Sequence, residues 1–516
     1  MSHISERKTQ TVRLGLQNML SLSKTLLVAS LALASACSST PDATTASAIV
    51  VGTGPSTTVS AGSFTQRSIS LSETLLNDPD SWSQSLASSF NMARQLVEND
   101  LDVDLADVDV RLVDEKPINA EVALETRRLV REQFGSSAFA EHFLNQVMGP
   151  LSGSYAALYS SRLGAVLISR SMLESYERSL PLQTSRSAKR SALLALLIHE
   201  LVHAADDKQY RIHDNRALNF RASFAQSATF EGHAQWVTRR ICQQAGCSSG
   251  MDALDNFMFS SHGSSAHSTQ AANRNVLEYS YVEGERFVSE LAARENGAAL
   301  LDSLLTSPPS DPVQILAPET YPDVAREDRN QALVSASRTV EHPWTTSPWI
   351  GVETSPLKGI DLRADPTRRQ AAVDGFTKLI QGMVSMQFYD QARPESSPVE
   401  ATILQAESAA TANMFASMLH ANTQMAGARV TNDPLTFAQV SNTSDTLENA
   451  RIYRTSIEAE LAYQTAYQSP FQTVIVVAGN HVVQVIGSTN EREELDDYAI
   501  RVLSNLSQTI AIAGNS

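Results

Sequence analysis

The alternation of apolar and polar positions divides the chain into segments of different character. Alternation typical of β-strands runs through "DVDVRLVDE" and "GAVLISRSML", and the spacing between and after these segments is helical. Residues 306–350 are dense in proline, which interrupts regular structure and indicates a connector or an extended segment. The pattern predicts an α+β fold, with one domain over 73–305 and a separate α+β domain over 351–512.

The region beyond residue 351 combines helical and strand-like patterns. Two long helical patterns, about 366–390 and 400–427, precede the strand-like segments "QTVIVVA" and "HVVQVIGS". Gly479 and Asn480 join these two segments, which suits a two-residue hairpin turn. The segment "EREELDDYAIRVLSNL" has the spacing of an amphipathic helix. The pattern indicates no role for this second domain.

The N-terminus has the features of an export signal. Basic residues precede the short apolar run "LLVASLALASA", and small residues lead to Cys37. We therefore expect a signal peptide over 1–36. The residues "LASAC" resemble a bacterial lipoprotein signal, which implies that Cys37 is lipidated and anchors the chain to a bacterial membrane, facing the periplasm or the exterior. The alternative is an ordinary secreted protein that is cut near Ala36.

Composition limits the classes of partner. The segment 37–72 is rich in Ser, Thr, Ala and Gly, which predicts a flexible tether. The formal net charge of -16 argues against a nucleic-acid partner, which would require clustered Lys and Arg. With 516 residues, the chain is long enough for two or more domains. No apolar run reaches the roughly 18 residues of a membrane-spanning helix.

The apolar segment "ALLALLIHELVHAADD" contains three polar residues that a core helix does not need. His199 and His203 are four residues apart, so on a helix they lie on the same face. Glu200 lies about 100° round from His199. Burying an unpaired carboxylate costs on the order of several kcal/mol, so a core with no use for Glu200 would seldom keep it. We interpret the three residues as a metal site.

The spacing H-E-x-x-H predicts a zinc ion held by two imidazoles, with the glutamate as general base. Zinc lowers the pKa of a bound water from 15.7 to about 7, which makes water a usable nucleophile. A third protein ligand is needed, and Glu231 in "FEGHAQWV" begins a helix-like segment downstream. The competing candidates are His213, His233 and Glu278; His233 is two residues past Glu231, so on a helix it points elsewhere.

These two motifs resemble the gluzincin-type zinc metallopeptidases of the thermolysin-like superfamily, in which HExxH is followed by a downstream glutamate. The resemblance implies a zincin-like domain that binds one zinc per chain. It assigns His199, His203 and Glu231 as ligands and Glu200 as general base. The segments "YSYVEGERFVSEL" and "QILAPETY" are also similar to parts of such proteins. The likeness covers roughly 100–325, and residues from 351 on resemble nothing in it.

The same resemblance implies two supporting roles. Asp207, four residues past His203, matches an aspartate that orients a ligand or caps the helix. A tyrosine or histidine commonly stabilises the oxyanion, and Tyr281 is our candidate, with Tyr279 and His267 behind it. The alternative for Tyr281 is an ordinary core aromatic with its hydroxyl at the surface.

The cysteines beyond the N-terminus lie close together in "CQQAGC". Export places them in an oxidising compartment, so Cys242 and Cys247 can form a disulfide, which would close only a small loop. A metal site at these cysteines is the weaker alternative, because no second pair is present to complete four ligands.

Together these features predict a zinc-dependent peptidase of the bacterial cell envelope, with a peptide or protein substrate. The alternative is a non-catalytic envelope binding or scaffold protein that retains the metallopeptidase fold. A non-peptide substrate is a third option, because the chemistry does not identify the acyl group. The sequence does not indicate the cleavage specificity, the choice between endo- and exopeptidase, or the oligomeric state.

Overall fold

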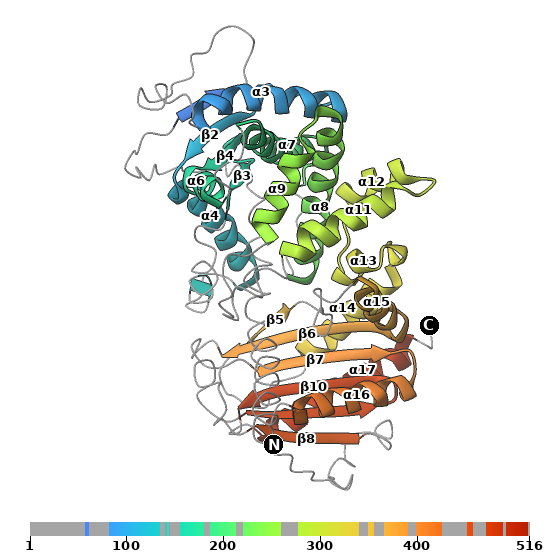
Figure 1. Cartoon of the computed structure of the whole chain (residues 1–516). Helices are drawn as coiled ribbons and strands as arrows, with labels where there is room; N and C mark the ends of the chain where they lie inside the picture. The colour runs from blue at the N-terminus through green and yellow to red at the C-terminus, as the bar shows by residue number, and fades with distance from the viewer. Residues whose placement is uncertain are drawn as a thin grey trace, which may run out of the picture.

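The computed structural model describes most of the chain from residue 82 onward and one short segment before it. The described residues form a mixed α+β structure that is mostly helical and contains two sheets (Figure 1). The expected signal peptide, 1–36, and Cys37 lie outside them. The described residues are 57–60, 82–134, 140–141, 144, 155–179, 186–212, 220–259, 277–322, 324–339, 349–354, 366–390, 399–425, 451–457, 471–488 and 492–513.

The smaller sheet has four strands in the order β1-β2-β4-β3. β2 (Asp109–Val113) runs parallel to β4 (Ala165–Ser169), and β3 (Ala157–Ser160) is antiparallel to β4 at one edge. β1 (Thr57–Ser60) is antiparallel to β2 at the other edge. β1 falls within 37–72, so four residues of the expected tether belong to this sheet, and the rest of that range lies outside the described residues.

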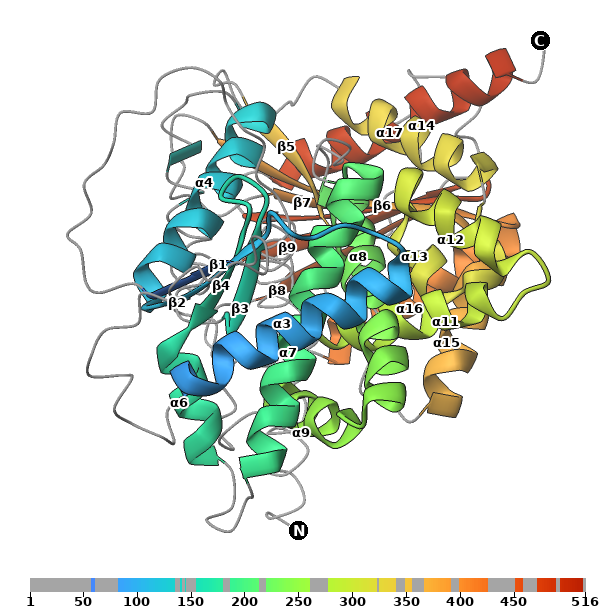
Figure 2. The same cartoon turned by 90° about the horizontal axis from the view of Figure 1, so that it is seen from above.

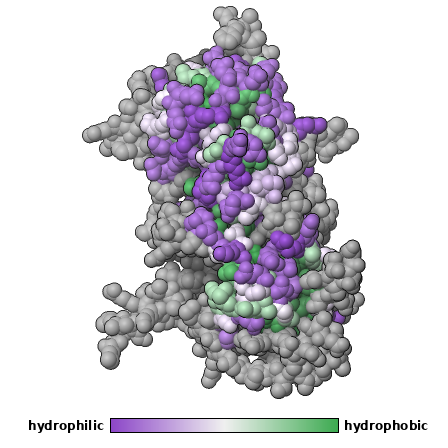
Figure 3. Space-filling model, turned by 90° about the vertical axis from the view of Figure 1, so that its right-hand side faces the viewer, coloured by the Kyte–Doolittle hydropathy of each residue, from purple (hydrophilic) through white to green (hydrophobic). Residues whose placement is uncertain are grey.

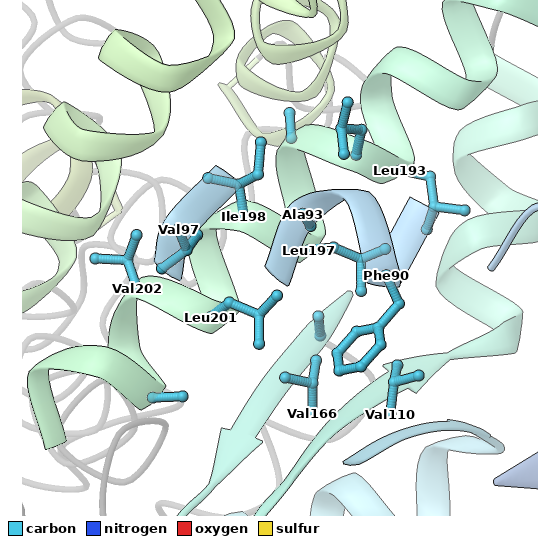
Figure 4. Close-up of a cluster of buried hydrophobic side chains, with 14 of the residues drawn as sticks. Phe90, Ala93, Val97, Val110, Val166, Leu193, Leu197, Ile198, Leu201 and Val202 are labelled. Carbon is cyan, nitrogen blue, oxygen red and sulfur yellow. The ribbon is translucent and has the colours of Figure 1, made fainter. Parts of the chain in front are cut away.

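The first core forms where α3 (Trp82–Leu101) and α7 (Arg186–Tyr210) meet this sheet. Each large apolar side chain that is fully buried contributes about 1.5–3 kcal/mol. The apolar residues of α7 therefore hold this helix in the core and offset the cost of burying its polar residues. The side chains labelled in Figure 4 are Phe90, Ala93, Val97, Val110, Val166, Leu193, Leu197, Ile198, Leu201 and Val202.

A second long helix, α8 (Phe220–Ala245), packs against α7. At its C-terminal end a disulfide joins Cys242 to Cys247, and both cysteines are buried. The chain then enters α9 (Ser248–Phe259), which packs along α7. Figure 2 shows α7, α8 and α9 side by side beneath α3. Other helices of this region are α4 (Glu115–Phe134), α6 (Arg170–Ser179) and α12 (Gly297–Thr306).

Two glycines allow α8 to touch the backbone of the next segment. This segment is the π-helix η1 (Glu278–Glu283), which continues into α11 (Gly284–Ala292). A Cβ atom added to Gly232 would lie 2.1 Å from the carbonyl carbon of Gly284, and one added to Gly284 would lie 2.1 Å from the carbonyl oxygen of Ala228. Any other residue would force the two backbones apart, so glycine is required for this approach.

The larger sheet has six antiparallel strands in the order β5-β6-β7-β10-β9-β8. α14 (Val324–Thr339) and α17 (Arg492–Ala513) pack against one face, and α16 (Ala409–Met425) packs against the other. Gly479, with φ of +55°, and Asn480 connect β9 to β10, as the sequence predicts. The strands are β5 (Trp349–Thr354), β6 (Ile380–Asp390), β7 (Val399–Ala406), β8 (Arg451–Ile457), β9 (Phe471–Ala478) and β10 (His481–Ser488).

The prediction of two long helices over 366–390 and 400–427 is wrong over 380–390 and 400–406, which form strands. α15 (Pro366–Leu379) ends where β6 begins, and β7 precedes α16. The described residues of β6 and β7 are mostly buried on both faces. In β6, however, the apolar Val384, Met386 and Phe388 alternate with Ser385 and Gln387, which are also buried, so the strand period is present in the sequence and the helical prediction overlooked it.

The proline-rich range 306–350 contains more regular structure than its composition predicts. It includes α13 (Pro312–Leu316), the 3-10 helix η2 (Pro318–Thr320) and the whole of α14. Pro312 and Pro318 stand at the first positions of their helices, where a missing N–H costs nothing. Prolines here therefore begin helices rather than break them.

A chain of buried polar contacts connects residues 306–350 to β6 of the larger sheet. Asp311 caps α13 by accepting from the Val313 N–H at 3.0 Å, and it accepts from the Asn330 side-chain amide at 2.8 Å. The Asn330 side-chain oxygen in turn accepts from the backbone N–H of Met383 in β6 at 3.0 Å. The range therefore packs against both parts of the molecule.

The surface of the described residues carries only scattered large apolar side chains. On the face shown in Figure 3, hydrophilic residues predominate and hydrophobic ones form small patches. Single exposed apolar residues are normal on protein surfaces. In the described parts of the chain, we find no helix with the length and apolar character that crossing a membrane requires. The exposed large hydrophobic residues are Met92, Leu124, Val282, Met414 and Met418.

We predict that Gly232→Ala destabilises the protein, because its Cβ would overlap the backbone of Gly284 and not a movable side chain. The expected loss is about 1–3 kcal/mol or more in the free energy of unfolding, measured by urea denaturation. Gly375→Ala in α15 is the control: its Cβ would meet nothing within 4 Å, so this variant should gain about 0.5–1 kcal/mol. An unchanged unfolding midpoint for Gly232→Ala would contradict the backbone contact.

Candidate metal centre

α7 carries His199 and His203 on one face, one turn apart. Both side chains are buried, and their Nε2 atoms lie 3.2 Å from each other. The apolar residues on the rest of α7 lie in the core, so the helix cannot rotate to expose the imidazoles to water without exposing its apolar faces.

α8 brings the third group, Glu231, to the same point. Its Oε2 lies 3.1 Å from Nε2 of His199 and 3.3 Å from Nε2 of His203. The three ligand atoms all lie within 4.8 Å of one another, and all three residues are buried. We call His199, His203 and Glu231 the ligand group. Two imidazole nitrogens and one carboxylate oxygen that converge in this way can hold a metal ion.

The charges within the ligand group support one another. Burial by itself would raise the pKa of Glu231, but the charges of the two histidines and their hydrogen bonds outweigh it and hold the pKa well below its usual value. Burial by itself would lower the pKa of His203, but Glu231, followed by Glu200 and Asp206, raises it. Glu231 is therefore ionised at neutral pH and offers a negative charge to a cation.

Glu200 lies beside the ligand group and contacts β3. Its Oε2 accepts a hydrogen bond from the backbone N–H of Tyr159 in β3, at 2.7 Å. Burial raises the pKa of Glu200, an effect that both histidines partly oppose. A buried carboxylate with a raised pKa has a greater affinity for a proton, which is the property that a general base requires.

Tyr281 is the described aromatic residue that contacts the ligand group. It lies on the π-helix η1, and its ring stacks on that of His199 with centroids 5.7 Å apart and an interplanar angle of 27°. π-helical turns are frequent at functional sites because they shift side chains out of the regular helical register.

The other aromatic candidates lie elsewhere. Tyr279 is fully buried, stacks on Phe224, and donates its hydroxyl hydrogen to the carbonyl of Pro312 at 3.0 Å. This places its hydroxyl in the packing between η1 and α13 and away from the ligand group. His267 lies outside the described residues.

The competing ligand candidates do not join the ligand group. His233 directs its Nδ1 to Oδ2 of Asp206, at 2.8 Å. Glu278 lies at the start of η1 and is not part of the group that the structure brings together. His213 lies outside the described residues.

The structure places Asp206, not Asp207, between the two ligand-bearing helices. Asp206 is fully buried and bonds to His233 of α8, whereas Asp207 is half-buried and lies where its charge raises the pKa of Tyr159. The role that the resemblance implies for Asp207, to orient a ligand or cap the helix, stays a prediction. A helix rotates by about 100° per residue, so neighbouring positions face different surroundings.

Two features of this site have little or no sequence signal. The N–H of Tyr159 that holds Glu200 is a backbone group, so any residue type except proline could supply it. The Asp206–His233 pair joins two helices through residues that match no spacing rule. The only sequence hint is that a charged residue at position 206 continues an otherwise apolar helix face.

Comparisons with known proteins add no family to this picture: no family model, no curated protein and no solved structure matches the chain.

Proposed function

We propose that this protein is a zinc-dependent peptidase of the gluzincin type, built on a zincin-like fold. The observation that carries the proposal is the ligand group of His199, His203 and Glu231, with Glu200 buried beside it and bonded through Oε2 to the N–H of Tyr159. A site that only stored a metal would have no use for a fourth buried ionisable group at that position.

The donor set favours zinc. Three protein ligands made of two imidazoles and one carboxylate are typical of catalytic zinc sites, which keep one position open for water or substrate. Calcium and magnesium prefer oxygen ligands alone, so the two histidines argue against them. Zinc, when bound, supplies a Lewis acid that polarises a carbonyl and lowers the pKa of water.

Glu200 is the residue that moves the proton. Its carboxylate takes the proton of the attacking water as the carbonyl carbon is attacked, and it then delivers that proton to the leaving amine nitrogen. The Tyr159 N–H holds one carboxylate oxygen, Oε2, so the side chain is oriented before substrate arrives. Tyr281, stacked on His199, is our candidate for donating its hydroxyl to the developing oxyanion.

The edge of β3 supports a peptide substrate. Ala156 directs its carbonyl to the N–H of Ser169, so the alternate residues Ala157 and Tyr159 direct their backbone groups to the other side. Within the described part of the chain, no strand pairs with this outer edge. Glu200 already takes the Tyr159 N–H, so an extended peptide that binds here by strand addition would bond to Ala157 and pass beside Glu200.

We predict that the purified protein binds one zinc per chain. His203→Ala should lose most of the zinc affinity, because one of three ligands is removed. Elemental analysis and zinc titration measure both. His420→Ala, the same substitution in α16, is the control and should bind zinc as the wild type does. Wild-type protein that takes up no stoichiometric metal would refute the proposed site.

A further prediction concerns Glu200→Gln, which keeps the shape of the side chain but cannot accept a proton. Peptide hydrolysis should fall by about 10²–10⁴-fold or more, while zinc content stays the same and the melting temperature holds or rises slightly. Glu319→Gln, an exposed position, should change none of the three. Hydrolysis at the wild-type rate would contradict the mechanism. Failure of both wild type and variant to cleave a broad peptide panel would favour the non-catalytic binding protein.

We also propose that Cys37 carries lipid and holds the protein at the bacterial cell envelope, as the residues "LASAC" indicate. Several acyl chains anchor a protein firmly, whereas one holds weakly. Cys37→Ser should therefore move the protein from the membrane fraction to the soluble fraction. Mass spectrometry of the mature wild-type protein checks the modification directly, and an unmodified N-terminus would show that the protein is secreted instead.

A further inference from the structure

Two buried polar atoms beside the ligand group have no hydrogen-bonding partner among the described residues. They are Nδ1 of His203 and Oδ1 of Asp206. His203 is 3% exposed and Asp206 is 0% exposed. Buried polar atoms in folded proteins nearly always have a partner, so two such atoms near a candidate metal centre call for an explanation. Their capacities are complementary, because an imidazole N–H donates and a carboxylate oxygen accepts.

The positions of the two residues allow them to meet. Asp206 follows His203 by three residues on α7, so the side chains are neighbours on one helix face, with about 5–6 Å between their Cβ atoms. The other carboxylate oxygen, Oδ2, is held by Nδ1 of His233 on α8 at 2.8 Å. Asp206 is therefore tied to α8 through one oxygen and has its second oxygen available close to His203.

We propose that Asp206 is a positioning residue for the metal ligand His203: in the metal-loaded protein, Oδ1 of Asp206 accepts a hydrogen bond from Nδ1–H of His203, directly or through one bound water. This hydrogen bond fixes the tautomer in which Nδ1 carries the hydrogen and Nε2 has its lone pair free. Nε2 is the atom that faces Glu231 and His199. Histidines that bind metals generally make such a bond to a carboxylate, a carbonyl or water.

His233 supports this role from the second helix. It lies two residues after Glu231 on α8, so the Asp206–His233 contact and the ligand group join the same two helices within one turn of each other. Asp206 touches no reacting atom and acts only through His203. The proposal rests on the metal site of the proposed function, but not on hydrolysis.

The test is the zinc affinity of Asp206→Asn, measured by competition with a chromophoric chelator. Asparagine has nearly the same size, but one acceptor oxygen becomes an NH₂ group, which cannot accept from a second imidazole. Affinity should fall about 10–100-fold. Asp252→Asn in α9 is the control, with the same change at an exposed position, and it should bind zinc as the wild type does.

If Asp206 only connects α7 to α8 and does not position His203, the result differs. In that case Asp206→Asn would lower the melting temperature of the metal-free protein and leave the affinity of the folded protein unchanged, which would overturn the proposal. Equal zinc affinity in both variants and the wild type would also overturn it. Wild-type protein without any zinc affinity would instead remove the proposed function, on which this role depends.

A measurement on the wild type does not depend on whether the variant folds. In zinc-loaded protein, ¹⁵N NMR of the histidine rings should show His203 protonated at Nδ1, with a slowly exchanging, hydrogen-bonded proton. Zinc-loaded protein in which His203 is protonated at Nε2, or in which its Nδ1 proton exchanges as fast as that of an exposed histidine, would refute the hydrogen bond.

Discussion

The contact between α7 and α8 is the interaction on which the candidate metal centre depends. Each helix alone carries an incomplete set of ligands, and only their packing brings Glu231 within 3.3 Å of both imidazoles. α7 is held by its apolar residues in the first core, and α8 is held from its other side by the close approach of Gly232 to Gly284. Because both helices are fixed by packing that does not involve the ligands, the ligand group is assembled before any ion arrives, which lowers the cost of binding.

Burial gives the site its electrostatic character. The low polarity of the surroundings would penalise each charged group alone, but Glu231 and His203 offset that penalty for each other: the pKa of Glu231 is lowered and that of His203 is raised. For Glu200, burial outweighs the opposing effect of the two histidines and raises the pKa. The same core therefore produces one carboxylate that stays ionised as a ligand and one that is ready to take a proton. Two carboxylates in one site with pKa values displaced in opposite directions are typical of acid–base chemistry.

Residues 306–350 connect the six-stranded sheet to the helices of the first part of the molecule. Residues 306–350 pack on α11 at one end, where Arg286 donates to the carbonyl of Leu316 at 2.8 Å, and on the six-stranded sheet at the other, where Asn330 reaches β6. α14 supplies apolar side chains to the core of that sheet. An extended connector would have left the two parts free to move relative to each other. Helices with buried contacts on both sides restrict that freedom.

The sequence alone determined the features that depend on local spacing: the face shared by His199 and His203, the hairpin at Gly479 and the last helix, α17, each of which follows from the period of a helix or the geometry of a short turn. It also singled out Glu231, because the resemblance implies a downstream glutamate as third ligand; the structure places this residue in the middle of α8 and not at the start of a helix. Only the tertiary structure decided that Asp206 bonds to His233 of α8, that the backbone of Tyr159 holds Glu200, and that Gly232 meets Gly284. These features depend on which segments meet across long sequence separations. A backbone N–H or a close approach of two glycines leaves little trace in residue types, so no local pattern could have revealed them.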